Sequence, residues 1–389
     1  MKKNKKTVYL DYAATTPVDP KVLSAMLPFF SEKFGNPASL YQVGREANMA
    51  LDSARNTIAG LLKINSGKIV FTGSATESNN LALKGVALAN KEKGNHLIVS
   101  AIEHDCVLSS AAWLEQQGFK VTYLPVDKFG LVNSEDLVKA LTKETILVSI
   151  MHANNEIGTI EPIKEIGALC RRRGVFFHTD AAQTFGKIPI DIAGMNIDML
   201  TASSHKIYGP KGAALLYLSD SVKIEPIIHG GGQEFGLRSS TVNVPAIVGF
   251  AKAAEISFQK MVNEGKRLTL LRNKLINGVL NRIPGSYLNG HPKKRLPNNV
   301  NFRFDFVEGE SIVLRLDALG VAASTGSACS SPKLTPSHVL VALGLNHGQA
   351  HGSLRLTLGR WSTKEKVDYL LKVLPGVIED LREISPFKS

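Results

Sequence analysis

Short apolar runs alternate with helix-like stretches between residues 69 and 218, and this alternation constrains the fold more than any other feature. Seven runs have the length of strands and the continuous apolar character of strands that are buried on both faces. They are Ile69–Phe71, Leu97–Ser100, Val121–Pro125, Ile146–Met151, Val175–His178, Met199–Thr201 and Ala213–Leu218. Helices between successive strands imply crossover connections, so the sequence predicts an α/β fold with a mostly parallel, seven-stranded sheet.

The pattern changes after residue 255, where a long amphipathic helix is expected over Ile256–Leu280. Strands are then expected near Val300–Phe304, Ala322–Ser324 and Leu354–Thr357, and helices near Glu310–Leu319, Pro336–Leu343 and Lys364–Ile384. A chain of 389 residues is long enough for a large domain and a smaller one. We therefore predict a large domain over residues 15–255 and a smaller α+β domain over residues 256–389, with residues 1–14 packing against the smaller domain.

Charge and hydropathy narrow the class of protein. No apolar run approaches the ~18 residues of a membrane span, and Asp11 interrupts the stretch that follows the basic N-terminus, so we expect a cytoplasmic protein without a membrane segment. The net charge of +12 raises the possibility of nucleic-acid binding. The basic residues are spread along the chain, however, apart from Lys2–Lys6 and Arg171–Arg173. Specific nucleic-acid binding is therefore not expected.

The three cysteines, Cys106, Cys170 and Cys329, are too few and too scattered for a disulfide framework. None belongs to a C-x-x-C pair, so neither a metal site nor a redox dithiol is predicted. Cys170 has apolar neighbours, as a buried structural cysteine does. Cys329 instead lies in a stretch from Ser324 to Pro336 that is dense in glycine, serine and proline, which indicates a loop. A thiol on such a loop can act as nucleophile and carrier.

Polar clusters follow several of the predicted strands, where an open α/β sheet binds its ligands. In the first cluster, Ser74-x-x-Glu77 has the form of a capping box that opens a helix after Gly73. The free N–H groups at the start of such a helix, at Ala75 and Thr76, favour a phosphate. An ordinary helix cap is the alternative interpretation.

Two further clusters place an acid and an amine at neighbouring strand ends. Asp180 follows a buried strand, where a helix cap, an internal ion pair or a cationic ligand such as a pyridinium nitrogen would each explain it. Lys206 comes 26 residues after Asp180, a spacing of about one β–α–β unit. It directly follows Ser203, Ser204 and His205. An amine in such a pocket loses basicity and becomes competent for a Schiff base. His104 and Asn155 follow two other strands; the histidine is suited to ring stacking and proton transfer, or to a structural role.

Together these clusters resemble those of the fold-type I pyridoxal-phosphate enzymes, and more narrowly the cysteine desulfurases of the NifS/IscS kind. The resemblance covers nearly the whole chain. Its stretches are Tyr9–Pro17, Phe34–Ser39, Ala75–Asn80, Asn154–Glu156, Asp180–Gln183, Ser203–Lys206, Gly230–Glu234 and Gly326–Cys329. Three departures from the family pattern occur: Gly73-Ser74 inverts the usual order, and Ser204 and Ser240 each replace a usual glycine.

The resemblance implies that pyridoxal phosphate is the cofactor and that Lys206 carries it covalently. It also implies that Asp180 pairs with the pyridine nitrogen, that Gln183 binds the phenolic oxygen and that His104 stacks on the ring. The phosphate would be bound by Ala75, Thr76, Ser203, His205 and, across a homodimer, Thr241. Asn155, which would also contact the cofactor, and Arg355 would orient the substrate, with Arg355 on its carboxylate.

The implied activity is that of a sulfurtransferase. Sulfur is removed from L-cysteine, which yields L-alanine and a persulfide on Cys329, and sulfur-acceptor proteins then take it for iron–sulfur cluster assembly or tRNA thiolation. A selenocysteine lyase is an alternative that the sequence leaves open. Two other interpretations are less favoured. An aminotransferase would not need a cysteine at position 329, and a non-catalytic docking scaffold would not need to retain every candidate catalytic residue.

Overall fold

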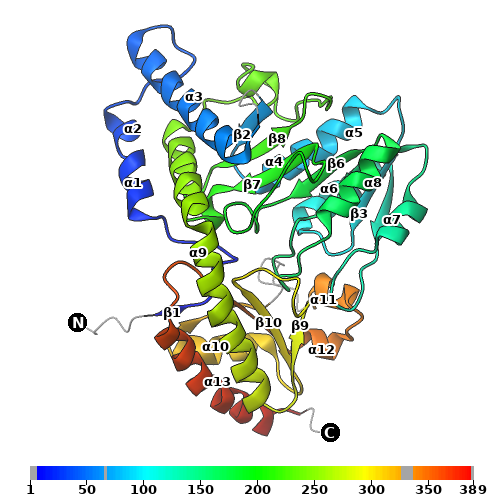
Figure 1. Ribbon diagram of the computed structural model, residues 1–389, viewed down its shortest axis with the longest axis vertical. Coiled ribbons are helices and arrows are strands. Elements are labelled where there is room, and N and C mark those ends of the chain that lie inside the picture. The colour runs from blue at the N-terminus through cyan, green and yellow to red at the C-terminus, as the bar shows by residue number, and fades with distance from the viewer. Residues whose placement is uncertain (1–6, 65–67, 326–335, 387–389) are drawn as a thin grey trace.

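The computed structural model describes residues 7–64, 68–325 and 336–386, so the predicted nucleophile Cys329 lies outside the described residues. Figure 1 shows an upper unit built on a large twisted sheet and a lower unit built on a small one. The strands of the large sheet are β2 (Ile69–Thr72), β3 (His96–Ser100), β4 (Lys120–Leu124), β5 (Thr145–Ser149), β6 (Phe176–Asp180), β7 (Met199–Ser203) and β8 (Ala214–Leu218). Each of them overlaps one of the seven predicted runs.

The order of strands in the large sheet is β2-β8-β7-β6-β5-β3-β4. Strand β8 runs antiparallel to both of its neighbours, whereas the other pairings in this sheet are parallel. The predicted fold class, α/β with a mostly parallel seven-stranded sheet, is thereby confirmed. Because β6 and β7 are parallel neighbours, their carboxyl ends reach the same edge of the sheet.

Helices cover both faces of the large sheet, and alternate residues of one strand enter two different cores. Ile98 belongs to the core that also contains residues of α1 (Pro20–Met26), α3 (Gln42–Leu62), α7 (Ser134–Ala140) and α8 (Ile163–Arg173). Leu97 and Val99 belong to the core of the opposite face, to which a π-helical turn (Leu81–Gly85), α5 (Val86–Ala89) and α6 (Asp105–Gln116) contribute; α4 (Ala75–Asn80) directly precedes that turn. Burial on both faces explains why the strands read as continuous apolar runs.

The longest helix, α9 (Val244–Arg282), runs from the upper unit into the lower one (Figure 1). The predicted start at Ile256 is wrong, since the helix begins twelve residues earlier. Its first turns, including Ile247, Phe250 and Ala254, are buried against the large core and lack the amphipathic pattern on which the prediction relied. The overlooked signal is Asn243, whose side chain caps the helix by accepting a hydrogen bond from the Ala246 N–H.

The lower unit contains an antiparallel sheet of order β12-β10-β9, formed by β9 (Ser286–Asn289), β10 (Asn299–Phe304) and β12 (Ser353–Thr357). Helices α10 (Gly309–Ala318) and α13 (Lys364–Glu383) pack on it together with the second half of α9. Near the chain's start, β1 (Val8–Tyr9) pairs in parallel with β11 (Val321–Ala322). The remaining helices are α2 (Pro28–Ser31), α11 (His338–Ala342) and α12 (His347–His351). In the described ranges, no helix has both the length and the apolar character that crossing a bilayer requires.

Candidate functional site

Most of the predicted site residues of the upper unit occupy the carboxyl ends of its strands or the turns that follow them. We call this group the strand-end site. Its members are Ala75 and Thr76 at the start of α4, His104 just before α6, Asp180 at the end of β6, Gln183 in the next turn, Ser203 at the end of β7, and His205 and Lys206 in a short 3-10 turn (Ser204–Lys206). Asp180 and Thr201 are register partners, so the acid and the β7 turn that carries Lys206 are neighbours.

Asp180 is buried and is held by neutral donors. The Asn79 side chain donates to Oδ2 at 2.7 Å and the Ala182 N–H donates to Oδ1 at 2.8 Å. No ion pair within the described residues involves Asp180. A buried carboxylate that has only neutral partners favours a cation in its vicinity. The internal ion pair considered from the sequence is therefore absent from this part of the chain, whereas turn capping and the recognition of a cationic ligand are both consistent with the contacts.

His104 and Cys106 meet beside Asp180. The Nδ1 atom of His104 accepts a hydrogen bond from the Cys106 N–H at 3.1 Å, so His104 caps α6 through one ring nitrogen. The Cys106 sulfur lies 3.1 Å from both His104 Nδ1 and Asn79 Nδ2. Burial, and then the charge of Asp180, raise the pKa of the Cys106 thiol to about 12. Cys106 is therefore a neutral neighbour of the site, which the sequence analysis did not anticipate.

The residues Asp11–Thr16, here called the N-terminal segment, lie against Lys206. The Lys206 ammonium donates to the carbonyl oxygens of Ala13 and Ala14, the latter at 2.8 Å. The Gln183 amide also donates to the Ala13 oxygen, at 3.1 Å. One carbonyl group thus joins two predicted cofactor ligands. Tyr9–Pro17 was part of the family resemblance, but only the folded chain shows that its backbone contacts the lysine.

A cluster of basic groups surrounds the turn after β7. Burial, followed by the charges of Lys206, Lys211 and Lys187, lowers the pKa of His205 to about 4, so its imidazole is neutral near pH 7. Its Nδ1 lies 3.1 Å from the Thr15 hydroxyl. Burial and the charge of Lys206 lower the pKa of Lys187 to about 7. Such a concentration of nitrogen donors is suited to an anion such as a phosphate.

The start of α4 differs in detail from the predicted capping box. The Ser74 hydroxyl accepts a hydrogen bond from the Glu77 N–H at 3.1 Å, as predicted. The Glu77 carboxylate, however, accepts from the Gly73 N–H at 2.9 Å and pairs with Arg238 at 2.7 Å. Arg238 thereby ties the segment that carries Thr241 to the first turn of α4. Thr241 itself is exposed.

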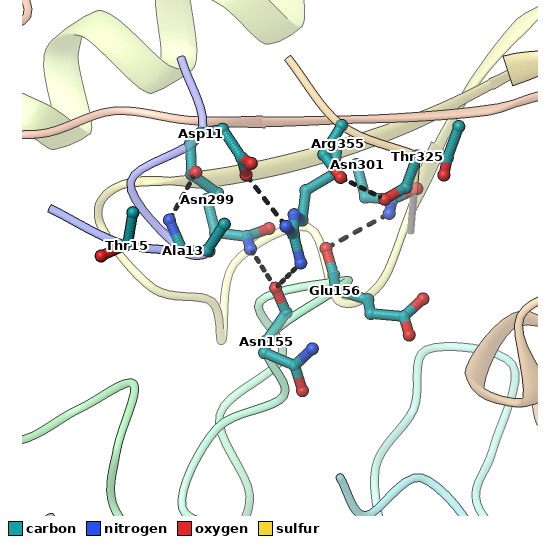
Figure 2. A network of polar contacts seen from close by, with 12 residues as sticks. Asp11, Ala13, Thr15, Asn155, Glu156, Asn299, Asn301, Thr325 and Arg355 are labelled. Carbon is teal, nitrogen blue, oxygen red and sulfur yellow. Dashed lines mark hydrogen bonds and ion pairs between the residues drawn. The ribbon is translucent and has the colours of Figure 1, made fainter. Parts of the chain in front are cut away.

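Asn155 and Arg355 meet where the two units join, in a group that we call the domain joint (Figure 2). It consists of Asp11, Asn155, Glu156, Asn299, Asn301 and Arg355. Arg355, in the middle of β12, donates to the Asn155 carbonyl at 3.4 Å and pairs with Asp11 at 2.9 Å. The side chains of Asn299 and Asn301, on β10, donate to the carbonyls of Asn155 and Glu156, both at 3.2 Å. The sequence predicted Asn155 and Arg355, but not the partners that hold them.

The donor set of the strand-end site fits a phosphorylated pyridine aldehyde. Asp180 supplies a buried carboxylate for a ring N–H, and Lys206 supplies an amine for an aldehyde. The basic cluster and the Ser203 hydroxyl supply partners for a phosphate. The neutral thiol of Cys106 and the Ala13 and Ala14 carbonyls of the N-terminal segment also lie at this site, and neither was predicted from the sequence.

Comparisons with known proteins agree with this arrangement. The family model described as aminotransferase class-V matches residues 8–370. The cysteine desulfurase IscS of Clostridium botulinum is 54% identical over 384 residues, which cover 98% of this chain and 96% of the relative. The cysteine desulfurase IscS 1 of Archaeoglobus fulgidus is 56% identical over 378 residues, covering 97% of this chain and 98% of that relative. A solved structure titled NifS-like protein superposes with a TM-score of 0.91 at 39% identity, over 96% of this chain and all of that one.

Proposed function

This chain belongs to the class-V aminotransferase family and is a cysteine desulfurase that uses pyridoxal phosphate, and we propose that Lys206 carries this cofactor and Cys329 receives the sulfur. The observation that carries the proposal is that buried Asp180 ends β6 while Lys206 lies in the turn directly after the adjacent parallel strand β7. The cofactor, when bound, supplies an electron sink for negative charge that develops at the substrate's α-carbon.

The residues of the strand-end site would hold the cofactor from several sides. Asp180 would accept the ring N–H, Gln183 would donate to the phenolic oxygen, and His104 would stack on the ring. Ala75, Thr76, Ser203 and His205 would bind the phosphate. Because His205 is neutral, it would act by hydrogen bonding, and the nearby lysines would supply the opposing charge.

The reacting groups are an amine and a thiol. Lys206 would remove the proton from the α-carbon of L-cysteine and later return a proton to the carbon product. Arg355 and Asn155 would hold the substrate's carboxylate. Cys329 would attack the substrate's sulfur as a thiolate, so that a sulfur–sulfur bond forms while the carbon–sulfur bond breaks. The products are L-alanine and a persulfide on Cys329, and the persulfide can pass to an acceptor thiol.

A homodimer is part of the proposal. Large apolar side chains are exposed along α1–α3, among them Leu27, Phe30, Phe34, Leu40, Tyr41 and Met49, with Leu40 89% exposed. The segment that carries Thr241 is tied to α3 by a buried ion pair of Glu234 with Arg55, at 2.8 Å. A second copy would cover this surface, and Thr241 would reach the partner's phosphate. An active, cofactor-saturated monomer in sedimentation would contradict this assembly.

The acceptors of sulfur are proposed to be proteins of iron–sulfur cluster assembly or tRNA thiolation. The name IscS belongs to relatives that share more than half of their residues with this chain. A cytoplasmic location is consistent with the two described cysteines, Cys106 and Cys170, both of which are free thiols. An assay of sulfur transfer to purified scaffold and thiolation proteins would identify the acceptor.

The assignment of Lys206 and Cys329 is tested by labelling and by substitution. Borohydride reduction of the holoenzyme, followed by peptide mapping, should place the pyridoxyl group on Lys206. After brief exposure to cysteine, mass spectrometry should show one added sulfur on the peptide that contains Cys329. Cys329→Ala should keep the cofactor's absorbance and produce almost no alanine.

Cys170→Ala is the matched control for this experiment, because Cys170 is buried in the core away from the site. It should retain turnover. Cys106 is a poorer control, since its sulfur contacts His104 and Asn79. A label on another lysine, or normal alanine production by Cys329→Ala, would overturn the assignment.

A further inference from the structure

Arg355 is buried in the domain joint, where one carboxylate of the described residues, that of Asp11, contacts it. Its side chain is 4% exposed, and its Nη2 lies 2.9 Å from Oδ1 of Asp11. Among the described residues, its Nη1 makes only the longer contact with the Asn155 carbonyl, at 3.4 Å. Asp11 is fixed by its backbone, since it bridges to Thr357 at the end of β12. The Asp11 carboxylate is therefore the stronger of the two contacts that orient the guanidinium among the described residues.

A second carboxylate, that of Glu156, also acts electrostatically on Arg355. It does not touch the guanidinium, because its Oε2 accepts a hydrogen bond from the Ser337 hydroxyl at 2.6 Å. Figure 2 shows the Glu156 side chain pointing away from Arg355, while Asp11 approaches the guanidinium from the opposite side to Asn155.

We propose that Asp11 is a positioning residue for substrate recognition: by pairing with Nη2 of Arg355, it holds the other guanidinium N–H groups where they can receive the carboxylate of the amino-acid substrate beside Asn155. A guanidinium carries five N–H donors in one plane, so a carboxylate bound at one nitrogen leaves donors for another. This inference rests on the proposed function, which assigns the substrate's carboxylate to Arg355 and Asn155. Asp11 itself acts through Arg355.

The test compares L-cysteine with cysteamine, which has the same amine and thiol but lacks the carboxylate. In the Cys329→Ala holoenzyme, which should bind substrate without turnover, the spectral change on adding L-cysteine or cysteamine gives a dissociation constant for each. Asp11→Ala should raise the constant for L-cysteine about tenfold, the value of one charged hydrogen bond, and leave that for cysteamine within about twofold. Asp11→Asn, which keeps an oxygen acceptor, should raise it about threefold.

Turnover gives an independent result. With Cys329 intact, Asp11→Ala should raise KM for L-cysteine by a similar factor and change kcat by less than about twofold, since it removes binding that ground state and transition state share. The matched control is Asp19→Asn. Asp19 forms another buried Asp–Arg pair, with Arg360 at 2.7 Å, and neither residue contacts Arg355 in the hydrogen bonds and ion pairs of the described residues. It should leave the cysteine-to-cysteamine ratio unchanged.

Three outcomes overturn the inference. If Asp11→Ala left the dissociation constant for L-cysteine unchanged, Arg355 would bind the substrate without being positioned by Asp11. If Asp11→Ala lowered that dissociation constant, Asp11 would compete with the substrate for Arg355. An equal loss for both ligands would assign Asp11 to the fold alone. If Asp11→Ala fails to fold, the ratio measured with Asp11→Asn decides. Failure of the proposed function looks different, because the wild type would then produce no alanine.

Discussion

The strand-end site and the domain joint are built in different ways, although both would contact the same substrate. In the strand-end site, each group follows its own strand within a few residues, as Asp180 follows β6 and Lys206 follows β7. In the domain joint, Asp11 and Arg355 are 344 residues apart, and Asn155 comes from a third part of the chain. The first site depends on one sheet, whereas the second depends on how two units dock. Chemistry at the cofactor and recognition of the carboxylate should therefore be separable by substitution.

The largest effect should come from the strand-end site. Asp180→Asn keeps a side chain that can bond to Asn79 but removes the negative charge that a ring N–H would need. We expect kcat to fall about 10³-fold, a loss typical of one electrostatic group in a buried active site. KM for L-cysteine should change far less, because Arg355 and Asn155 remain. Steady-state alanine production measures both constants.

The control for Asp180→Asn is an acid at the opposite end of the same sheet. Asp198 directly precedes β7, and its carboxylate accepts a hydrogen bond from the Phe177 N–H at 2.9 Å. Asp198→Asn should leave kcat within about threefold of the wild type, a range that is small against the expected 10³-fold loss. If Asp180→Asn also kept kcat within about threefold of the wild type, the strand-end site would not be the region on which the chemical step depends.

The sequence could place the candidate residues of the strand-end site at one edge of the sheet because the determinants of that placement are local. A strand, a turn and a polar cluster are adjacent in the chain, so Asp180 and Lys206 could be assigned to one sheet edge from spacing. The contacts of Ala13 with Lys206 and of Asp11 with Arg355 could not be predicted in this way, since they depend on the docking of the N-terminal segment. The start of α9 was missed for a related reason: its first turns are buried all round and carry no amphipathic signal.

Glu156, in the domain joint, should make the free energy of unfolding depend on pH. Burial raises the pKa of Glu156 from 4.5 to about 7, against the opposing effect of the Ser337 hydrogen bond. Between those two pH values, the folded protein keeps a proton that the unfolded chain releases, so stability falls as pH rises and is constant above about pH 7. Glu156→Gln has no such proton. From pH 4.5 to pH 8 the variant should gain about 3 kcal/mol relative to the wild type.

Urea unfolding at several pH values measures this difference. Glu103 and Glu161 also have pKa values that burial raises to about 8, but both proteins contain them, so their contribution cancels. Glu92→Gln, at an exposed turn, should show no pH-dependent gain. Parallel pH curves for the wild type and Glu156→Gln would mean that Glu156 is ionised in the folded joint.

The smallest effect concerns the upper unit, at a position where local sequence and backbone disagree. Ser240 has φ of 138°, in the region that favours glycine, and the family resemblance indicated that a glycine is usual there. Ser240→Gly should therefore relieve strain. Because glycine also gives the unfolded chain more freedom, the net gain should be at most about 1 kcal/mol. For a chain of this size we expect the melting temperature to rise by roughly 1–3 °C.

Ser240→Gly is informative for two reasons, although the expected change in stability is small. The hydrogen bond that fixes Ser240 comes from its backbone N–H to Gln233, at 3.0 Å, so the substitution removes no side-chain contact of that kind. The domain joint lies elsewhere, so KM for L-cysteine should stay unchanged. A control at Ser221, which is exposed and outside the left-handed region, should lose stability when changed to glycine. Destabilisation by Ser240→Gly would show that the serine side chain stabilises the fold in a way that its backbone conformation does not indicate. Local sequence would then fail to explain this loop of the upper unit, and the contrast with the domain joint would not hold there.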